Sequence, residues 1–226
     1  MQDPIIITGC ARSFTSLTAG IIHHCGAFGG KMVGPSPRLN PKGFFENVVI
    51  RNQIIKPFLR KLGADPLGQL PLPAIDRVPR QTDLRERIQT VMKSEGYRGG
   101  PWFFKVVKGC LIWPALAEAF PDARWIIVHR DKEEIAESCL NADFMRAYNT
   151  LEDWIWWVEQ YQDRLEQIAG DPDTDVEHVW PAKMVYEDDF QEMKEIVEWA
   201  GLQWNEEKVR DFVIPRAVDI ANEEEG

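Results

Sequence analysis

The chain has 226 residues, of which 44% are hydrophobic, and its formal net charge is −10. This length and composition favour one folded domain over residues 1–226 and exclude an intrinsically disordered chain. No stretch approaches the roughly 20 apolar residues of a membrane-spanning helix, and the N-terminus has no basic, signal-like segment. We therefore expect a cytoplasmic protein without a membrane span.

The charge is unevenly distributed along the chain. Residues 1–62 contain eight basic and two acidic residues, so their net charge is +6 and that of the rest is −16. Proteins that bind nucleic acid usually have a basic surface overall, so this pattern favours a small anionic ligand and no nucleic-acid partner. The four cysteines are scattered, and adjacent histidines such as His23 and His24 point about 100° apart on a helix. We expect reduced thiols and no metal site.

Apolar periodicity and Pro/Gly positions predict alternating strands and helices. The expected strands are Ile5–Thr8, Trp102–Val107, Trp125–Val128 and Lys183–Tyr186. The expected helices are Thr15–Cys25, Glu46–Leu62 (bent or interrupted by Pro57), Thr82–Glu95, Cys110–Phe120, Asp131–Leu140 and Leu151–Ile168, with two acidic helices near the end. Proline-rich loops are expected at Gly34–Gly43 and Ala64–Arg80.

This alternation predicts an α/β protein with three layers, α/β/α, around a mostly parallel central sheet. In such folds ligands bind beyond the carboxyl ends of the strands. The segments that follow the expected strands are Gly9–Ser16, Lys105–Lys108, His129–Arg130 and Tyr186–Asp188.

The segment Gly9–Ser16 has the spacing of the nucleotide-binding motif G-x-x-x-x-G-K-[ST], but Phe14 and Thr15 replace its second glycine and its lysine. A conventional ATP or GTP site is therefore disfavoured. A strand-to-helix turn still offers free N–H groups to an anion, and Arg12 adds a planar cation. The hydroxyls of Ser13, Thr15 and Ser16 are either further anion donors or ordinary helix caps.

A second anion site is possible after the strand Trp125–Val128. Arg130 follows that strand directly, and Ser138 lies eight residues later, about two turns into the next helix. An arginine fork and a hydroxyl could hold a phosphate there. The alternative is a surface ion pair between Arg130 and Asp131 or Glu134.

The order of these motifs resembles that of the sulfotransferases that use 3′-phosphoadenosine 5′-phosphosulfate (PAPS). Ala11–Ser16 resembles the family's P-[KR]-S-G-T-[TS] loop, and Val128–Asp131 with Ser138 resembles its strand-end Arg and later Ser. Five more segments are similar to segments of the family. They are NPKGFFEN (Asn40–Asn47), FFKVVKG, PALAEAFPDARWIIVHR, MVYEDDF and WAGLQWNEE. The resemblance covers nearly the whole chain.

The resemblance implies a P-loop NTPase-like fold and transfer of a sulfuryl group from PAPS, without a metal, to a hydroxyl or amine of a small-molecule or glycan acceptor. It assigns the 5′-phosphosulfate to the loop and the 3′-phosphate to Arg130 and Ser138. The expected donor-binding residues are Arg12, Ser13, Phe14, Thr15, Ser16, Arg130, Ser138 and Tyr186.

The expected catalytic residues are Glu46, Lys105 and Arg12, with Lys42, Lys108 and Trp156 on the acceptor side. Glu46, in the NPKGFFEN segment, is the candidate base, although it could instead cap the helix that follows.

Three features depart from the family pattern. Phe14 replaces the loop glycine, Val107 stands where the cytosolic branch has a catalytic His, and the acidic tail 219–226 replaces a basic glycine loop. The pattern therefore matches the branch with a carboxylate base. A divergent P-loop nucleotide kinase and a catalytically inactive nucleotide-binding protein remain as alternatives.

Overall fold

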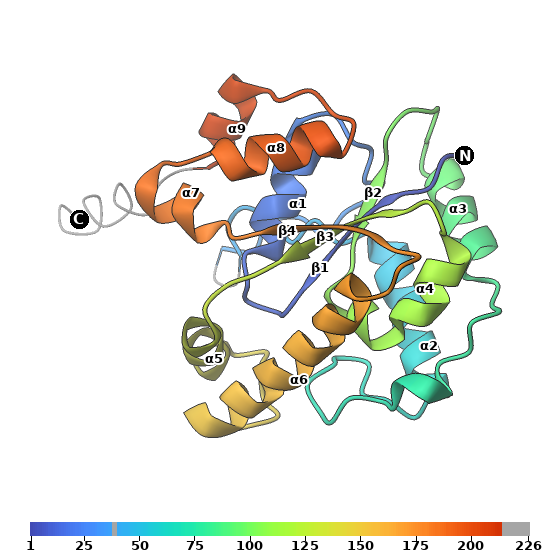
Figure 1. Ribbon diagram of the computed structural model, residues 1–226, viewed down its shortest axis with the longest axis vertical. Coiled ribbons are helices and arrows are strands. Elements are labelled where there is room, and N and C mark those ends of the chain that lie inside the picture. Colours follow the sequence, from blue (N-terminus) through green and yellow to red (C-terminus); the bar gives the residue numbers. More distant parts are fainter. Residues whose placement is uncertain (38–39, 214–226) are drawn as a thin grey trace.

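The computed structural model describes residues 1–37 and 40–213, so the tail 219–226 lies outside the described residues. Its sheet has four strands in the order β2-β1-β3-β4, and every neighbouring pair is parallel (Figure 1). The strands are β1 (Ile5–Gly9), β2 (Phe103–Lys105), β3 (Arg124–Val128) and β4 (Asp175–Val179).

Helices connect and cover these strands. They are α1 (Thr15–His24), α2 (Lys56–Lys61), α3 (Leu84–Ser94), α4 (Trp113–Ala119), α5 (Lys132–Leu140), α6 (Leu151–Ala169), α7 (Ala182–Glu187), α8 (Gln191–Trp199) and α9 (Glu206–Phe212). A π-helical segment, Ile50–Ile55, precedes α2, and 3₁₀ turns occupy Ile75–Arg77 and Val107–Ile112. Among the described residues, no helix combines the length and apolarity needed to cross a membrane.

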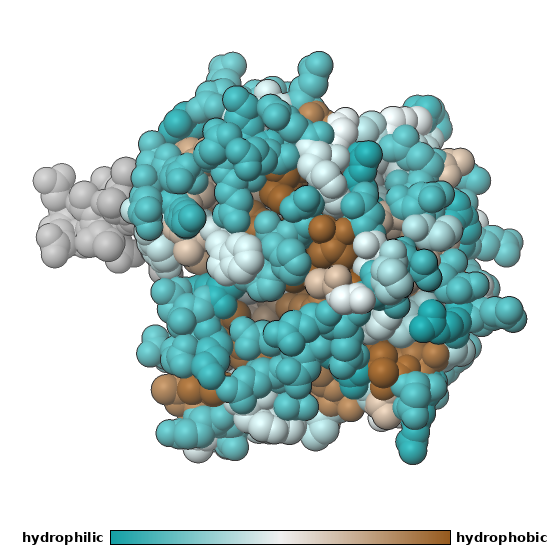
Figure 2. All heavy atoms as spheres, in the orientation of Figure 1, coloured by the Kyte–Doolittle hydropathy of each residue, from teal (hydrophilic) through white to brown (hydrophobic). Residues whose placement is uncertain are grey.

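The sheet separates two hydrophobic cores, which confirms the predicted three-layer architecture. Successive side chains of a strand point to opposite faces. Accordingly Ile6 packs with α3 to α6, whereas Ile5 and Ile7 pack with α1, α8 and α9 (Figure 1). The surface shown in Figure 2 is mostly hydrophilic, with hydrophobic patches in its recesses, as expected for a chain whose apolar residues cover both faces of the sheet.

Capping and periodicity explain the helices next to the site. Asp131 caps α5, because its side chain accepts a hydrogen bond from the Glu134 N–H at 3.0 Å. Helix α6 buries one apolar face, which runs from Trp154 to Ile168 and recurs with the helical period. Thr150 caps α6 by accepting from the Asp153 N–H.

The predicted helix Glu46–Leu62 is interrupted, as Pro57 requires. The chain is π-helical up to Ile55 and α-helical from Lys56. Proline lacks an N–H group, so the carbonyl four residues earlier loses its helical partner. That carbonyl belongs to Gln53, and it accepts a hydrogen bond from Arg87 Nη2 at 2.8 Å instead.

The prediction of a last strand at Lys183–Tyr186 was wrong, because this segment belongs to helix α7. Pro181 at its N-cap position suits a helix start. The fourth strand is β4, where Val176 and Val179 in the sequence DVEHV provided a short β-branched signal. The predicted helix Cys110–Phe120 also starts later, since a 3₁₀ turn precedes α4.

The topology determines where a ligand can bind. Helix α1, which follows β1, packs in one core, and α5, which follows the neighbouring β3, packs in the other. The two connections leave adjacent strands toward opposite faces, which opens a crevice at the carboxyl ends of the strands.

Candidate active site

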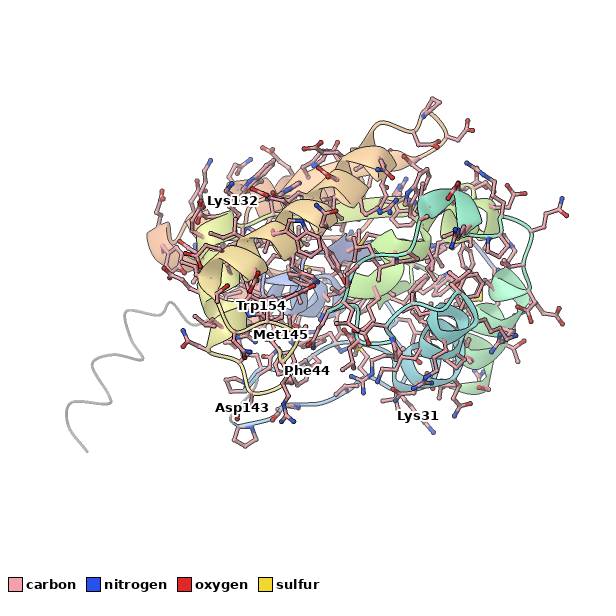
Figure 3. All side chains as sticks on the ribbon, turned by 90° about the horizontal axis from the view of Figure 1, so that it is seen from below. Lys31, Phe44, Lys132, Asp143, Met145 and Trp154 are labelled. Carbon is pink, nitrogen blue, oxygen red and sulfur yellow. The ribbon has the colours of Figure 1, made fainter. Side chains whose placement is uncertain are left out.

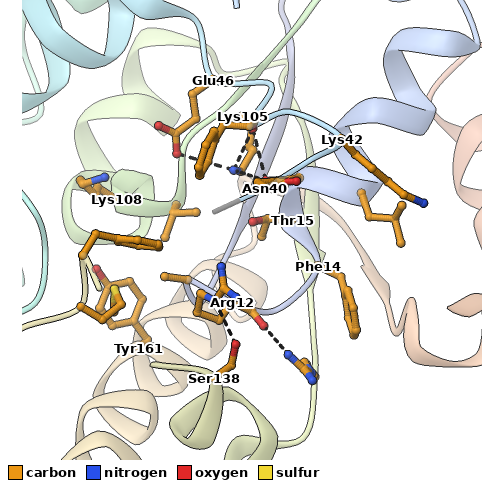
Figure 4. A pocket seen from close by; sticks show the side chains of 18 of the residues that line it. Arg12, Phe14, Thr15, Asn40, Lys42, Glu46, Lys105, Lys108, Ser138 and Tyr161 are labelled. Carbon is orange, nitrogen blue, oxygen red and sulfur yellow. Dashed lines mark hydrogen bonds and ion pairs between the residues drawn. The ribbon is translucent and has the colours of Figure 1, made fainter. Parts of the chain in front are cut away.

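A cavity of about 660 Å³ lies at the carboxyl ends of β1, β2 and β3 (Figure 4). Its described lining contains seven basic residues and a single carboxylate, Glu46. The basic residues are Arg12, Lys42, Arg51, Lys56, Lys105, Lys108 and Arg130. Such a concentration of positive charge suits an anionic ligand.

The loop after β1 makes a tight turn with two residues in the left-handed conformation. Arg12 has φ 71° and Phe14 has φ 66°, values that glycine adopts more readily than other residues. Phe14 is the N-cap residue of α1, so the N–H groups of the first turn, which follows it, have no acceptor within the helix. Gly9 is required for close packing, because a Cβ there would lie 2.6 Å from the Val128 carbonyl oxygen.

Phe14 keeps the glycine-like turn and also packs against Arg130. The Arg130 guanidinium lies 4.5 Å from the centroid of the Phe14 ring, which is a cation–π contact. Arg130 Nη1 donates to the Arg12 carbonyl oxygen at 2.9 Å, and Arg130 Nε pairs with Glu134 at 2.7 Å. The alternative ion pair with Glu134 is therefore present, and Arg130 still lines the cavity.

Ser138 and Arg130 both line the cavity, and both form hydrogen bonds with Arg12. Arg12 Nε donates to Ser138 Oγ at 2.9 Å, and the Arg12 backbone binds Arg130. The structure thus joins the two predicted anion sites into one group.

The loop hydroxyls serve different purposes. Ser13 is fully buried and donates to the Cys10 carbonyl oxygen at 2.7 Å, so its hydroxyl supports the turn and does not line the cavity. Thr15 and Ser16 do line the cavity. Ser16 Oγ accepts a hydrogen bond from Lys105 Nζ at 2.9 Å.

Lys105 and Glu46 form a buried pair in the lining of the cavity. Their side chains approach to 3.6 Å, and Arg51 lies 3.3 Å from the other Glu46 oxygen. Burial raises the pKa of Glu46, but Lys105, Lys108 and Arg51 outweigh it, so the pKa lies below its usual value. Burial lowers the pKa of Lys105, although the negative charge of Glu46 opposes this shift.

Glu46 does not cap the helical segment that follows it. Asn47 does so instead, because its Oδ1 accepts hydrogen bonds from the N–H groups of Val49 and Ile50.

Part of the cavity lining is apolar, and Gly68 holds two of its aromatic side chains in place. The Gly68 carbonyl oxygen accepts hydrogen bonds from Trp157 Nε1 and Tyr161 Oη, both at 2.9 Å. Gly68 has φ 70°, and a Cβ there would lie 2.4 Å from the Tyr161 hydroxyl. Phe44 and Met145, labelled in Figure 3, come from distant segments and line the same cavity.

Besides the buried Ser13, two predicted site residues, Trp156 and Tyr186, do not line the cavity. Trp156 is 42% exposed on α6, whereas its neighbour Trp157 faces the cavity. Tyr186 is 47% exposed, and its ring centroid lies 6.3 Å from that of Phe14. Lys42 lines the cavity and donates to the Phe212 carbonyl oxygen at 2.8 Å.

Several lining residues were not predicted from the sequence. They include Arg51, Lys56, Phe144, Met145 and Tyr161. Arg51 and Lys56 lie in the basic region 1–62, which was the only sequence signal for them. Among the described residues, no group of three or more His, Cys, Asp or Glu is arranged to hold a metal ion.

The chain belongs to the sulfotransferase family, whose model matches residues 4–206. Its structure is similar to sulfotransferase STF9 from Mycobacterium avium, with a TM-score of 0.55, 17% identity and coverage of 93% of this chain and 67% of that one. For sulfotransferase STF1 from Mycobacterium tuberculosis H37Rv the TM-score is 0.48, the identity 15% and the coverages 94% and 71%. No curated protein matches the sequence. Family membership supports sulfuryl transfer over the nucleotide-kinase alternative.

Substitution of Phe14 tests the strain in the turn. Alanine keeps the left-handed strain, whereas glycine removes it, and both lose the ring. We expect Phe14→Gly to be more stable than Phe14→Ala by about 1 kcal/mol, measured by urea denaturation. Equal stability of the two variants would show that the backbone at this position is relaxed.

His129, which precedes Arg130, predicts a pH dependence of stability. Its Nε2 lies 2.7 Å from His178 Nδ1, and burial followed by the charge of His178 lowers the pKa of His129 to about 4. In the unfolded chain this pKa is about 6.5. Between these values the unfolded chain binds more protons, so the free energy of unfolding decreases as the pH falls from about 6.5 to 4.

The variant His129→Phe retains a ring against Trp180 and removes the titrating group. We expect its free energy of unfolding to depend less on pH over this window, measured by urea denaturation at several pH values. An unchanged slope in the variant would assign the pH dependence to other groups.

Proposed function

We propose that this protein transfers a sulfuryl group from PAPS to a hydroxyl or amine of a small-molecule or glycan acceptor. The observation that supports this most strongly is the cation-lined cavity at the carboxyl ends of the strands, with a single described carboxylate in contact with a buried lysine. The donor has a 3′-phosphate, a 5′-phosphate and a sulfate, which match such a lining in charge.

On this proposal the loop end of the cavity binds the donor. Arg12 and the first N–H groups of α1 hold the 5′-phosphosulfate, because helix N-termini and planar guanidinium groups both favour phosphate-like anions. Arg130 and Ser138, which are both linked to Arg12, hold the 3′-phosphate. Phe14 keeps the Arg130 guanidinium in place through the cation–π contact.

On this proposal Glu46 and Lys105 act in the transfer step. The acceptor oxygen forms a bond to sulfur as the bond from sulfur to the phosphate oxygen breaks, and the acceptor proton passes to Glu46. Lys105 and Arg12 offset the negative charge on the transferring and leaving groups. The anionic donor opposes the surrounding cations, so it raises the lowered pKa of Glu46 when bound and makes this carboxylate a better base.

The acceptor lies toward Lys108 and the apolar part of the lining on this proposal. Trp157 and Tyr161, which line the cavity, take the role that the sequence suggested for Trp156. Lys42 lines the cavity on the side away from Lys108 (Figure 4), and on this proposal it contacts the acceptor from there.

Titration with adenosine 3′,5′-bisphosphate tests the donor site. We expect affinity in the micromolar range and binding of AMP weaker by about 10- to 100-fold, because charge-assisted hydrogen bonds contribute about 1.5–3 kcal/mol. Arg130→Ala should remove most of this discrimination, measured by calorimetry with ADP and ATP as comparisons. A preference for ATP, or an Arg130→Ala variant that still discriminates, would contradict the assignment.

Substitution of Glu46 tests the base. Glu46→Gln preserves the shape of the side chain but cannot accept the proton, so turnover should fall by about 10²- to 10⁴-fold while the bisphosphate still binds. Sulfated product can be quantified by mass spectrometry with a phenol as acceptor. Full turnover in the variant would exclude Glu46 as the base, and a parent protein that binds the bisphosphate without any turnover would favour the inactive alternative.

A further inference from the structure

A second group of cations lies on the Glu46 side of the cavity, away from the phosphate-binding loop. It consists of Arg51, Lys56 and Lys108, all of which line the cavity. Figure 4 shows Lys108 on the same side as Glu46, with Phe14 on the other. The group therefore lies beyond the residues that the proposed function assigns to the donor.

The π-helical segment brings two of these cations together. The Lys56 N–H donates to the Arg51 carbonyl oxygen, which closes one π-helical turn between residues five apart. In an α-helix with 3.6 residues per turn, side chains five apart would point roughly 140° away from each other. Such local π-helices occur often at functional sites. The 3₁₀ turn after β2 adds Lys108 from another segment.

The group has more positive charge than its surroundings balance. Glu46 is already paired with Lys105 and Arg51. Within residues 1–37 and 40–213, neither the Lys56 nor the Lys108 side chain forms a hydrogen bond or an ion pair with another residue. Burial, and then Arg51 and Lys108, lower the pKa of Lys56. Like charges held close together in a cavity repel one another unless an anion lies between them.

Apolar side chains border this cationic group. Leu67, Phe144, Met145, Trp157 and Tyr161 line the same cavity. Gln69 fixes this wall, because its side chain donates to the Phe144 carbonyl oxygen at 2.8 Å and accepts from the Arg146 N–H at 2.9 Å. A ligand here would meet positive charge at one end and an apolar surface along its body.

We propose that the acceptor is an apolar hydroxyl compound that also has an anionic group, and that Lys56 and Lys108 bind this group. This inference rests on the proposed function. The anion on the two lysines and the apolar body against Trp157 and Met145 direct the hydroxyl toward Glu46, which takes its proton as the oxygen bonds to sulfur. Arg51 stays with Glu46 and supports the charge of the subsite.

Three matched phenols test the inference by calorimetry on the full chain saturated with adenosine 3′,5′-bisphosphate. They are 3-(4-hydroxyphenyl)propionate, its neutral methyl ester and the cationic tyramine. We expect the carboxylate to bind at least about tenfold more tightly than the other two, which corresponds to about 1.4 kcal/mol. Lys56→Gln and Lys108→Gln should each reduce this preference.

Lys61→Gln is the matched control, because Lys61 is exposed on the same helix α2 and its loss changes the net charge equally. It should keep the preference, and the thermal midpoints of the three variants should agree. A carboxylate that binds no better than the ester overturns the inference. So does weaker bisphosphate binding in Lys56→Gln or Lys108→Gln, which would place these lysines in the donor site. If the parent does not bind the bisphosphate, the proposed function itself fails.

Discussion

The buried ammonium group of Lys105 is the constraint on which the site depends. Lys105 is 5% exposed, and a buried charge is tolerated only with close polar partners. Its Nζ donates to Ser16 Oγ and to the Phe44 carbonyl oxygen at 3.0 Å, and it pairs with Glu46. One cation thus joins the end of β2, the start of α1 and the segment before the π-helix, and all three segments contribute side chains to the cavity lining.

In the loop after β1, a phenylalanine occupies a left-handed backbone conformation that usually favours glycine. Phe14 adopts a conformation that costs little for glycine and about 1–2 kcal/mol for other residues. Its ring contacts the Arg130 guanidinium and the edge of Tyr186, which offset that cost. Strained backbone of this kind is common at functional sites, where the surrounding structure holds it in place. The strain here serves to bring Arg130 and Arg12 to one edge of the cavity.

Local patterns in the sequence are enough to predict the layers and three of the four strands, and to place candidate site residues at the strand ends. Short apolar runs bounded by glycine or proline indicate strands and turns. Apolar residues that recur every 3.6 positions indicate helix α6. The rule that ligands bind at the carboxyl ends of parallel strands was enough to group Arg12, Lys105 and Arg130. The basic region 1–62 also predicts an anionic ligand, and four of its cations, Arg12, Lys42, Arg51 and Lys56, line the cavity.

Contacts between side chains from distant segments could not be predicted from the sequence, because they depend on how the whole chain folds. The strand β4 was missed because an exposed edge strand has a weak apolar pattern, and α7 was mistaken for it. Ser138 bonds to Arg12, and Trp157 lines the cavity in place of Trp156, because loop paths and helix rotation set those contacts. Packing energy depends on neighbours far apart in the chain, whereas periodicity reports only on residues within a few turns.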